Sequence, residues 1–143
     1  WPGLVGSEMC IRDSPRTLDW LQASYDIGYQ VITMDEYREL GQKKCAQMIL
    51  DRLGDNPIYI TFDLDCLDPS VAPGVANIEP AYNGFNMDEV RKLLQSLKGK
   101  NVIGGDVVCL MPTKDSPNQI TAMVAASVMF EIICLISINL GKK

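Results

Sequence analysis

Three aspartates stand together at the end of an apolar run in the stretch YITFDLDCLDPSVAPG, residues 59–74. Asp63 and Asp65 are two residues apart, so on a continuous strand both side chains would point to the same side. They also fall at the carboxyl end of the expected strand, which is where open parallel sheets place their ligands. Two hard oxygen donors in that position indicate a divalent ion such as manganese or magnesium. A capped turn with solvated carboxylates is the alternative interpretation of the same spacing.

Other polar and thiol side chains are expected to have structural roles. Asp68 opens a turn-rich segment and is expected to bond nearby backbone N–H groups. Asp115 or Ser116 is expected to cap the last helix. Asp106 is expected to bond the backbone or a neighbouring strand, and Cys66 to point into the core.

The composition excludes several kinds of site. The 143 residues include no histidine, which excludes histidine general bases and histidine metal ligands within this chain. Five scattered cysteines without a CxxC pair indicate free thiols in a reducing compartment rather than a zinc knuckle or a disulfide framework. The formal net charge of −5 argues against a basic nucleic-acid surface.

The elements that must position these side chains alternate along the chain from Ser14 onward. Alternation of helices and strands predicts an α/β domain with a parallel sheet and right-handed crossovers, without an internal linker. Ser14, Asp35 and Asn86 are the expected N-caps. The expected helices are 14–28, 35–54, 86–99 and 116–141, and the expected strands are 29–34, 57–65 and 101–110.

Two of these elements are apolar on more than one side. The strand at 57–65 is apolar on both faces, as in a parallel sheet covered on each side. The last helix is long enough for a membrane span and carries a single charge, Glu131. Its small residues Ala122, Ala125, Ala126 and Ser127 suit packing on a sheet, so we expect a helix buried in the protein.

Residues 1–13 differ from the rest of the chain. The segment has no basic start and no long apolar core, so it is not a signal peptide, and it predicts neither a helix nor a strand. We expect residues 1–13 to be a non-native leader, such as translated sequencing-adapter sequence. An ordinary irregular N-terminus is the alternative.

Several stretches resemble one enzyme family. FDLDCLDPSVAPG is similar to the SxDxDxxDPxxAPG signature of the arginase and agmatinase family of ureohydrolases. NVIGGDVVCLMPTKD resembles the later GxDVVEvxPxxD strand and loop, QITAMVAASVMFEIICLI the closing helix, and GYQVITMDEYRELG the segment upstream. The likeness covers nearly all of 14–143, which is expected to be the C-terminal part of a single ureohydrolase domain, with agmatinase-like members the more similar.

The resemblance implies a fold and a chemistry. The family has a three-layer α/β/α fold and two manganese ions, with nickel as the alternative, that generate hydroxide to attack a guanidinium carbon and release urea and an amine. Carried over by position, Asp63 would bridge both metals and Asp65 would bind one of them. The other ligands lie in GGDHS-like and DAHxD-like motifs, which this chain lacks. The fragment alone is therefore expected to be inactive, and no catalytic residue is assigned in it.

One departure from the family falls at Cys109. The family has a glutamate there that pairs with the guanidinium group of the substrate, so Cys109 is the expected substrate-facing position; a small buried thiol is the structural alternative. Glu79 resembles a family loop residue loosely and is interpreted as solvated.

Two classes of function remain open. The first is an agmatine-hydrolysing enzyme of polyamine metabolism, or a relative acting on guanidinobutyrate, guanidine or another guanidino compound. The second is a non-catalytic homologue that serves as a subunit or scaffold. The resemblance further implies a homo-oligomer, trimer or hexamer, in the cytoplasm, with a mitochondrial location as the alternative and with neither nucleic acid nor membrane as partner.

Overall fold

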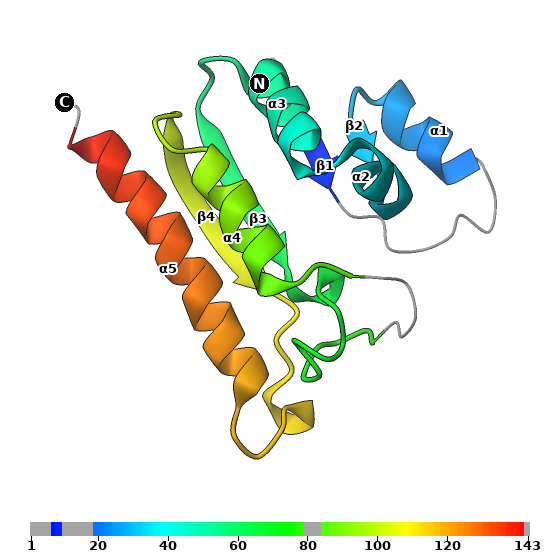
Figure 1. Cartoon of the computed structure of the whole chain (residues 1–143), viewed down its shortest axis with the longest axis vertical. Helices are drawn as coiled ribbons and strands as arrows, with labels where there is room; N and C mark the ends of the chain where they lie inside the picture. The colour runs from blue at the N-terminus through cyan, green and yellow to red at the C-terminus, as the bar shows by residue number, and fades with distance from the viewer. Residues whose placement is uncertain (1–6, 10–18, 79–83, 142–143) are drawn as a thin grey trace. The chain divides into compact units, whose positions relative to one another are not determined.

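The computed structural model describes residues 7–9, 19–78 and 84–141. The chain divides into two compact units, which we call unit 1 (Trp1–Arg52) and unit 2 (Leu53–Lys143). Both contain a pair of parallel strands (Figure 1), so the predicted parallel pairing is confirmed in each.

Unit 1 combines a short strand pair with three helices. Its elements are β1 (Ser7–Met9), α1 (Asp19–Asp26), β2 (Gln30–Ile32), α2 (Met34–Leu40) and α3 (Gln42–Leu53). β1 pairs with β2, from Ser7 opposite Gln30 to Met9 opposite Ile32. The expectation that residues 1–13 contain no strand was therefore wrong; their foreign origin stays a prediction. Ser14 lies outside the described residues.

The helix expected at 35–54 is two helices. Gly41 interrupts it with φ +78°, a conformation that residues with a Cβ rarely adopt. The N-cap is Thr33 and not Asp35: the Thr33 hydroxyl accepts from the Glu36 N–H, and the Glu36 carboxylate accepts from the Thr33 N–H. Thr33 is the N-cap because Glu36, three residues later, completes a capping box with it.

Unit 2 is built on two longer strands and two helices. β3 (Ile58–Asp63) pairs with β4 (Val102–Val108). The register shifts between Ile58 and Tyr59 and brings Asp63 opposite Val108 at the carboxyl edge. α4 (Met87–Ser96) begins at Asn86, whose side chain accepts from the Glu89 N–H, so the predicted N-cap is confirmed. α5 (Ile120–Leu140) packs against β4 and α4.

β3 is covered on one face only in the part of the chain that the structure describes. Ile60 and Phe62 are half-buried, whereas Tyr59, Thr61 and Asp63 on the opposite face are exposed. Coverage of the second face stays a prediction, because apolar composition does not say which neighbouring elements supply it.

A single stripe of α5 faces the strands. Thr121, Val124, Val128, Ile132 and Leu135 recur at helical spacing and are buried. Gly105 on β4 permits the approach, since a Cβ there would lie 2.8 Å from Ile132 Cγ2 and 2.7 Å from the Ile60 carbonyl oxygen. The close contact between α5 and β4 therefore requires a residue without a side chain at position 105.

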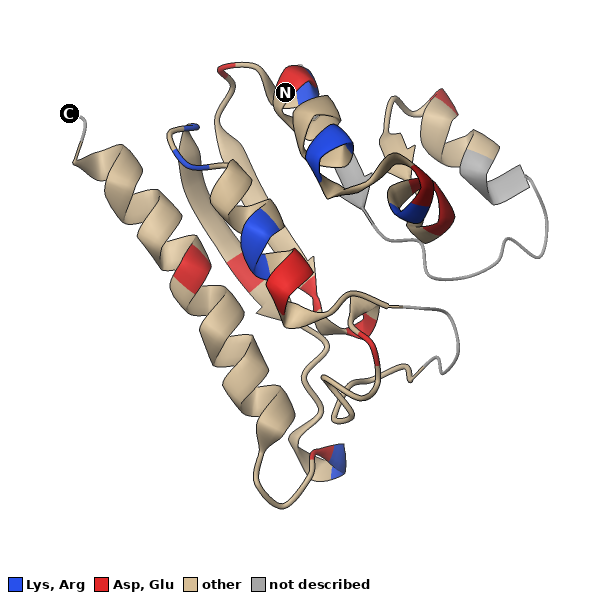
Figure 2. Cartoon of the chain, viewed as in Figure 1, with Lys and Arg blue, Asp and Glu red and all other residues tan. Residues whose placement is uncertain are grey.

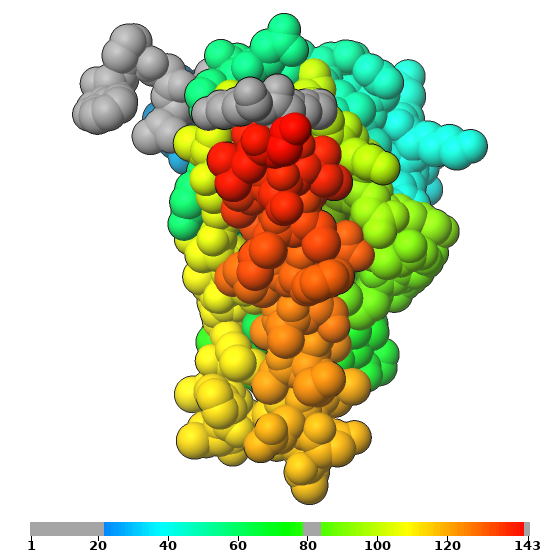
Figure 3. All heavy atoms as spheres, turned by 90° about the vertical axis from the view of Figure 1, so that its left-hand side faces the viewer, coloured from blue at the N-terminus to red at the C-terminus, as the bar shows by residue number. Residues whose placement is uncertain are grey.

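The outward side of α5 is apolar and exposed. Met123 is 62% exposed, Phe130 64% and Ile133 54%. Figure 2 shows one charge on this helix, and Figure 3 shows its outward side as a continuous surface in orange and red. The expectation of a buried helix is therefore met on one side of α5 only, and of the four small residues Ala122 and Ala125 are half-buried whereas Ala126 and Ser127 are exposed.

By length and composition α5 would suffice to cross a membrane. Its mean hydropathy is 2.2 over the most apolar window, of which 28% is buried. A core helix of a soluble protein has the same composition, so the helix does not by itself indicate a membrane protein. That this protein has no membrane partner stays a prediction.

Candidate metal centre

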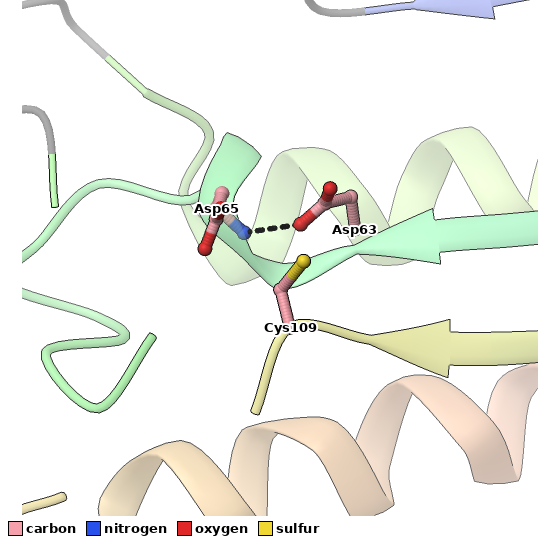
Figure 4. Close-up of side chains that lie close together, drawn as sticks. All are labelled: Asp63, Asp65 and Cys109. Carbon is pink, nitrogen blue, oxygen red and sulfur yellow. Dashed lines mark hydrogen bonds between the residues drawn. The ribbon is translucent and has the colours of Figure 1, made fainter. Parts of the chain in front are cut away.

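Asp63 and Asp65 meet at the carboxyl end of β3, but not in the way expected. β3 ends at Asp63, and Leu64–Cys66 form a 3₁₀ turn. Asp63 caps this turn, its Oδ1 accepting from the Asp65 N–H at 2.9 Å (Figure 4). The prediction of two side chains on one continuous strand was wrong, because the Asp63 carboxylate offers the backbone a local turn in place of the ladder. The turn nevertheless keeps the two carboxylates together.

Asn77 holds the Asp65 carboxylate from the loop that follows. The Asn77 side-chain amide donates to Asp65 Oδ2 at 3.1 Å, and the Asn77 backbone N–H donates to Oδ1 at 3.3 Å. Both carboxylate oxygens thus have a fixed direction. Sequence reasoning missed Asn77, whose position twelve residues after Asp65 gives no local signal.

Asp68 fixes the start of the same loop, as predicted. Its Oδ1 accepts from the Ser70 N–H at 2.9 Å and also from the Ser70 hydroxyl. Its backbone carbonyl accepts from Val71 and Ala72, which makes a compact turn.

Cys109 follows the end of β4 and joins the cluster. Its backbone has φ +68°, and its carbonyl accepts from the Ala76 N–H at 3.1 Å. The Cys109 Sγ lies with one carboxylate oxygen each of Asp63 and Asp65 so that all three atoms are within 4.8 Å of one another. Figure 4 shows the sulfur directed toward the space beside the two carboxylates. The carboxyl ends of two paired parallel strands meet at one edge, which is what brings the three together.

The electrostatics of the cluster favour a cation. Burial, together with a hydrogen bond and charge repulsion from Asp63 and further repulsion from Asp65, raises the pKa of the Cys109 thiol to about 12. A third negative charge, on the sulfur, is therefore disfavoured beside the two carboxylates, and a bound divalent ion would reverse that balance.

The remaining candidate residues have structural roles, as predicted. The Tyr59 hydroxyl donates to Asp106 Oδ2 at 3.1 Å across the two strands. Gln119 holds the N-cap position of α5 without a side-chain cap bond, and Asp115, not Ser116, satisfies the first turn from outside it: its Oδ1 accepts from Thr121 N at 3.1 Å and its Oδ2 from Ala122 N at 3.0 Å. Burial would raise the pKa of Asp115, but hydrogen bonds from Ala122, Thr121 and Ser116 outweigh it and lower the pKa to about 2.

Two further candidates from the sequence remain, Cys66 and Glu79. Cys66 is half-buried in the 3₁₀ turn and is absent from the group of three donors. Glu79 lies outside the described residues.

The donor set fits a divalent metal ion. Carboxylate oxygens suit manganese and magnesium, whereas a thiol suits softer ions such as zinc. Three donors leave a coordination sphere that needs further ligands, since manganese and magnesium favour six oxygen-type positions.

The sequence model of the Arginase family matches residues 7–135. The chain belongs to the arginase family. That match includes Asp63, Asp65 and Cys109, and it extends over most of α5. An agmatinase from Photorhabdus laumondii is 36% identical over 133 residues, which cover 93% of this chain and 41% of that protein. The chain thus spans less than half the length of this curated relative.

Solved structures of arginase-family hydrolases resemble the fold. Proclavaminate amidino hydrolase from Streptomyces clavuligerus superposes with a TM-score of 0.80 at 29% identity, over 93% of this chain and 42% of the other. A hypothetical agmatinase from Burkholderia thailandensis gives 0.77 at 32% identity, over 96% of this chain and 40% of the other. The expected three-layer α/β/α, arginase-like fold class is confirmed.

Proposed function

We propose that the protein hydrolyses a guanidino compound of the agmatine class to urea and an amine, and that these 143 residues supply part of its binuclear metal centre. The observation that carries the proposal is the convergence of Asp63, Asp65 and Cys109 at the carboxyl edge of the β3–β4 pair. The likeness to agmatinases over almost the whole chain supports the reaction class.

Within this centre the two aspartates have separate roles. Asp63 uses one oxygen to cap the 3₁₀ turn and, by resemblance to the family, would help to hold the metal pair; Asp65 would contribute a second carboxylate, whose direction Asn77 fixes. We propose manganese, with nickel as the alternative. When bound, such a metal pair supplies Lewis acidity and lowers the pKa of water to near neutral.

The remaining ligands are proposed to come from residues outside this chain. Two carboxylates and a thiol do not complete the coordination of two ions, and the chain contains no histidine. Histidine-bearing motifs of the GGDHS and DAHxD kind are therefore expected elsewhere in the full protein. If those motifs are present but have lost their ligands, the second candidate, a non-catalytic subunit or scaffold, is favoured. Cys109 in place of the family glutamate is the observation on its side.

Metal binding by the isolated chain tests the division of the centre. Because affinity depends on several preformed ligands, calorimetry on the 143-residue chain should show no tight Mn²⁺ binding and no urea release. Asp63→Asn is the matched control for any weak heat. Micromolar or tighter binding of two ions would contradict the proposal that this chain holds part of the site.

Cys109 is proposed to decide the substrate. A hydrogen bond between a carboxylate and a guanidinium group stabilises the bound substrate by about 1.5–3 kcal/mol. A thiol is only a weak hydrogen-bond donor and acceptor and does not replace it. In the complete enzyme, Cys109→Glu should raise kcat/KM for agmatine at least about tenfold. Robust agmatine turnover by the wild type, with no gain in the variant, would show that this position does not face the guanidinium.

The oligomeric state and the cellular compartment follow from the same resemblance. We propose a homo-oligomer, trimer or hexamer, in the cytoplasm. The exposed apolar side of α5 supports a covering surface of some kind in the full protein, because Phe130 and Met123 are each more than half exposed here.

A further inference from the structure

The backbone of Cys109 fixes the direction of its side chain. Its φ of +68° is uncommon for a residue with a Cβ, and the hydrogen bond from Ala76 N to its carbonyl fixes the peptide. The neighbouring residues Val75 and Leu110 pair in an antiparallel β-bridge next to this bond. The side chain is consequently directed across the carboxyl edge toward Asp63 and Asp65, as Figure 4 shows.

The separations within the cluster suit a shared ion. A point equidistant from three atoms at most 4.8 Å apart lies within about 2.8 Å of each, and zinc needs about 2.3 Å to sulfur and about 2.0–2.2 Å to oxygen. Side-chain shifts of about 0.5–0.8 Å, well within reach of a rotamer adjustment, close the difference. Asp63 and Cys109 stand at the ends of paired strands, so no large backbone movement is required.

Resting on the metal centre proposed above, we propose that the Cys109 sulfur is a direct ligand of the ion that Asp63 and Asp65 bind. The S–H proton passes to solvent as the metal–sulfur bond forms. The wild-type sulfur then belongs to the metal sphere and leaves the guanidinium group without a partner at this position, so Cys109→Glu, which restores the family's substrate contact, is still expected to raise agmatine turnover. A thiolate among oxygen donors shifts the preference of the site from manganese toward cobalt and zinc.

Cobalt provides the test, because a cobalt–thiolate bond gives a charge-transfer band in the near ultraviolet that carboxylate ligands do not give. The 143-residue chain, which has no histidine to compete, is titrated with Co²⁺ to millimolar concentration, and total bound cobalt is measured in parallel by equilibrium dialysis. The variants are Cys109→Ser and the double variant Asp63→Asn with Asp65→Asn. Cys66→Ser is the matched control, since Cys66 lies in the same 3₁₀ turn as Asp65 but outside the group of three donors.

The proposal expects the band in the wild type and in Cys66→Ser, and its loss in Cys109→Ser and in the aspartate double variant. The affinity for cobalt should fall at least about tenfold in Cys109→Ser, since the loss of a residue that only bonds a metal ligand already lowers metal affinity by that amount. Circular dichroism confirms that each variant is folded.

Four results would overturn the proposal. A band that survives Cys109→Ser assigns the sulfur to another cysteine. A band that survives the loss of both aspartates shows that Cys109 binds cobalt without them. Cobalt bound through the aspartates with no band leaves the proposed metal centre intact but removes Cys109 from it, whereas no cobalt binding at all overturns both this inference and the metal-binding role of this chain.

Discussion

Gly105→Ala tests the contact that fixes the strand carrying Cys109. The new methyl would lie 2.7 Å from the Ile60 carbonyl oxygen and 2.8 Å from Ile132 Cγ2. Neither neighbour has room to move, since one is backbone in β3 and the other belongs to a fully buried side chain of α5. Overpacking of this kind costs about 1–3 kcal/mol, against a gain of about 0.5–1 kcal/mol from replacing a glycine in a strand. The two ranges together give a net loss of about 0–2.5 kcal/mol in the free energy of unfolding, and the upper part of that range is expected because both neighbours are rigid.

Gly104→Ala is the matched control on the opposite face of β4. Its methyl would meet the Tyr59 ring at 3.0 Å, but Tyr59 is 60% exposed, and its ring can shift outward at the cost of no more than the exposed hydrogen bond to Asp106. Its effect should stay within about 0.5 kcal/mol. The measurement is urea denaturation followed by far-ultraviolet circular dichroism, where a loss of about 2 kcal/mol lowers the midpoint by about 1–2 M. Equal midpoints for the two variants would refute the close approach of α5 to Gly105.

The other predictions concern the loop and the helix cap. Asn77→Ala should weaken Co²⁺ binding by the chain about tenfold in equilibrium dialysis, because Asp65 loses the amide that orients it. The control Asn118→Ala removes an amide that accepts from the Ser116 hydroxyl and should leave the Co²⁺ affinity unchanged. Equal losses of affinity in the two variants would contradict the positioning role of Asn77. Asp115 has its pKa lowered to about 2, so its contribution to stability is present above the usual pKa of 3.8 and is lost as the pH falls toward 2. The thermal midpoint of the wild type should therefore fall over that interval, and Asp115→Asn should start several degrees lower at neutral pH and fall less; an unchanged profile would contradict the cap.

Local signals in the sequence predicted local structure well. Asn86 was recognisable as an N-cap because a glutamate follows three residues later, and the same rule applied to Thr33 would have located the start of α2. The turn at Asp68 and the capping of α5 by Asp115 are likewise decided by side chains bonding nearby N–H groups. These features depend on a few neighbouring residues, so composition and spacing are sufficient to find them.

Features that depend on distant contacts were not predictable in the same way. Asp65 leaves the strand because the Asp63 carboxylate competes for its N–H, and Asn77 meets Asp65 only after the loop has folded back. The stripe of α5 that is buried is selected by Gly105 and its neighbours on β4, and the helix is too uniformly apolar to reveal it. Cys109 was identified by resemblance, but its approach to both aspartates follows from the register of β3 and β4.

The most direct measurement is urea release by a chimera in which residues 7–135 replace the matching segment of the Photorhabdus laumondii agmatinase, loaded with manganese. The account predicts metal-dependent urea release from agmatine, raised at least about tenfold by Cys109→Glu and abolished by Asp63→Asn. A folded, metal-loaded chimera whose urea release is unchanged by Asp63→Asn, or which releases none even with Cys109→Glu, would contradict the claim that this chain supplies part of a guanidino-hydrolase centre.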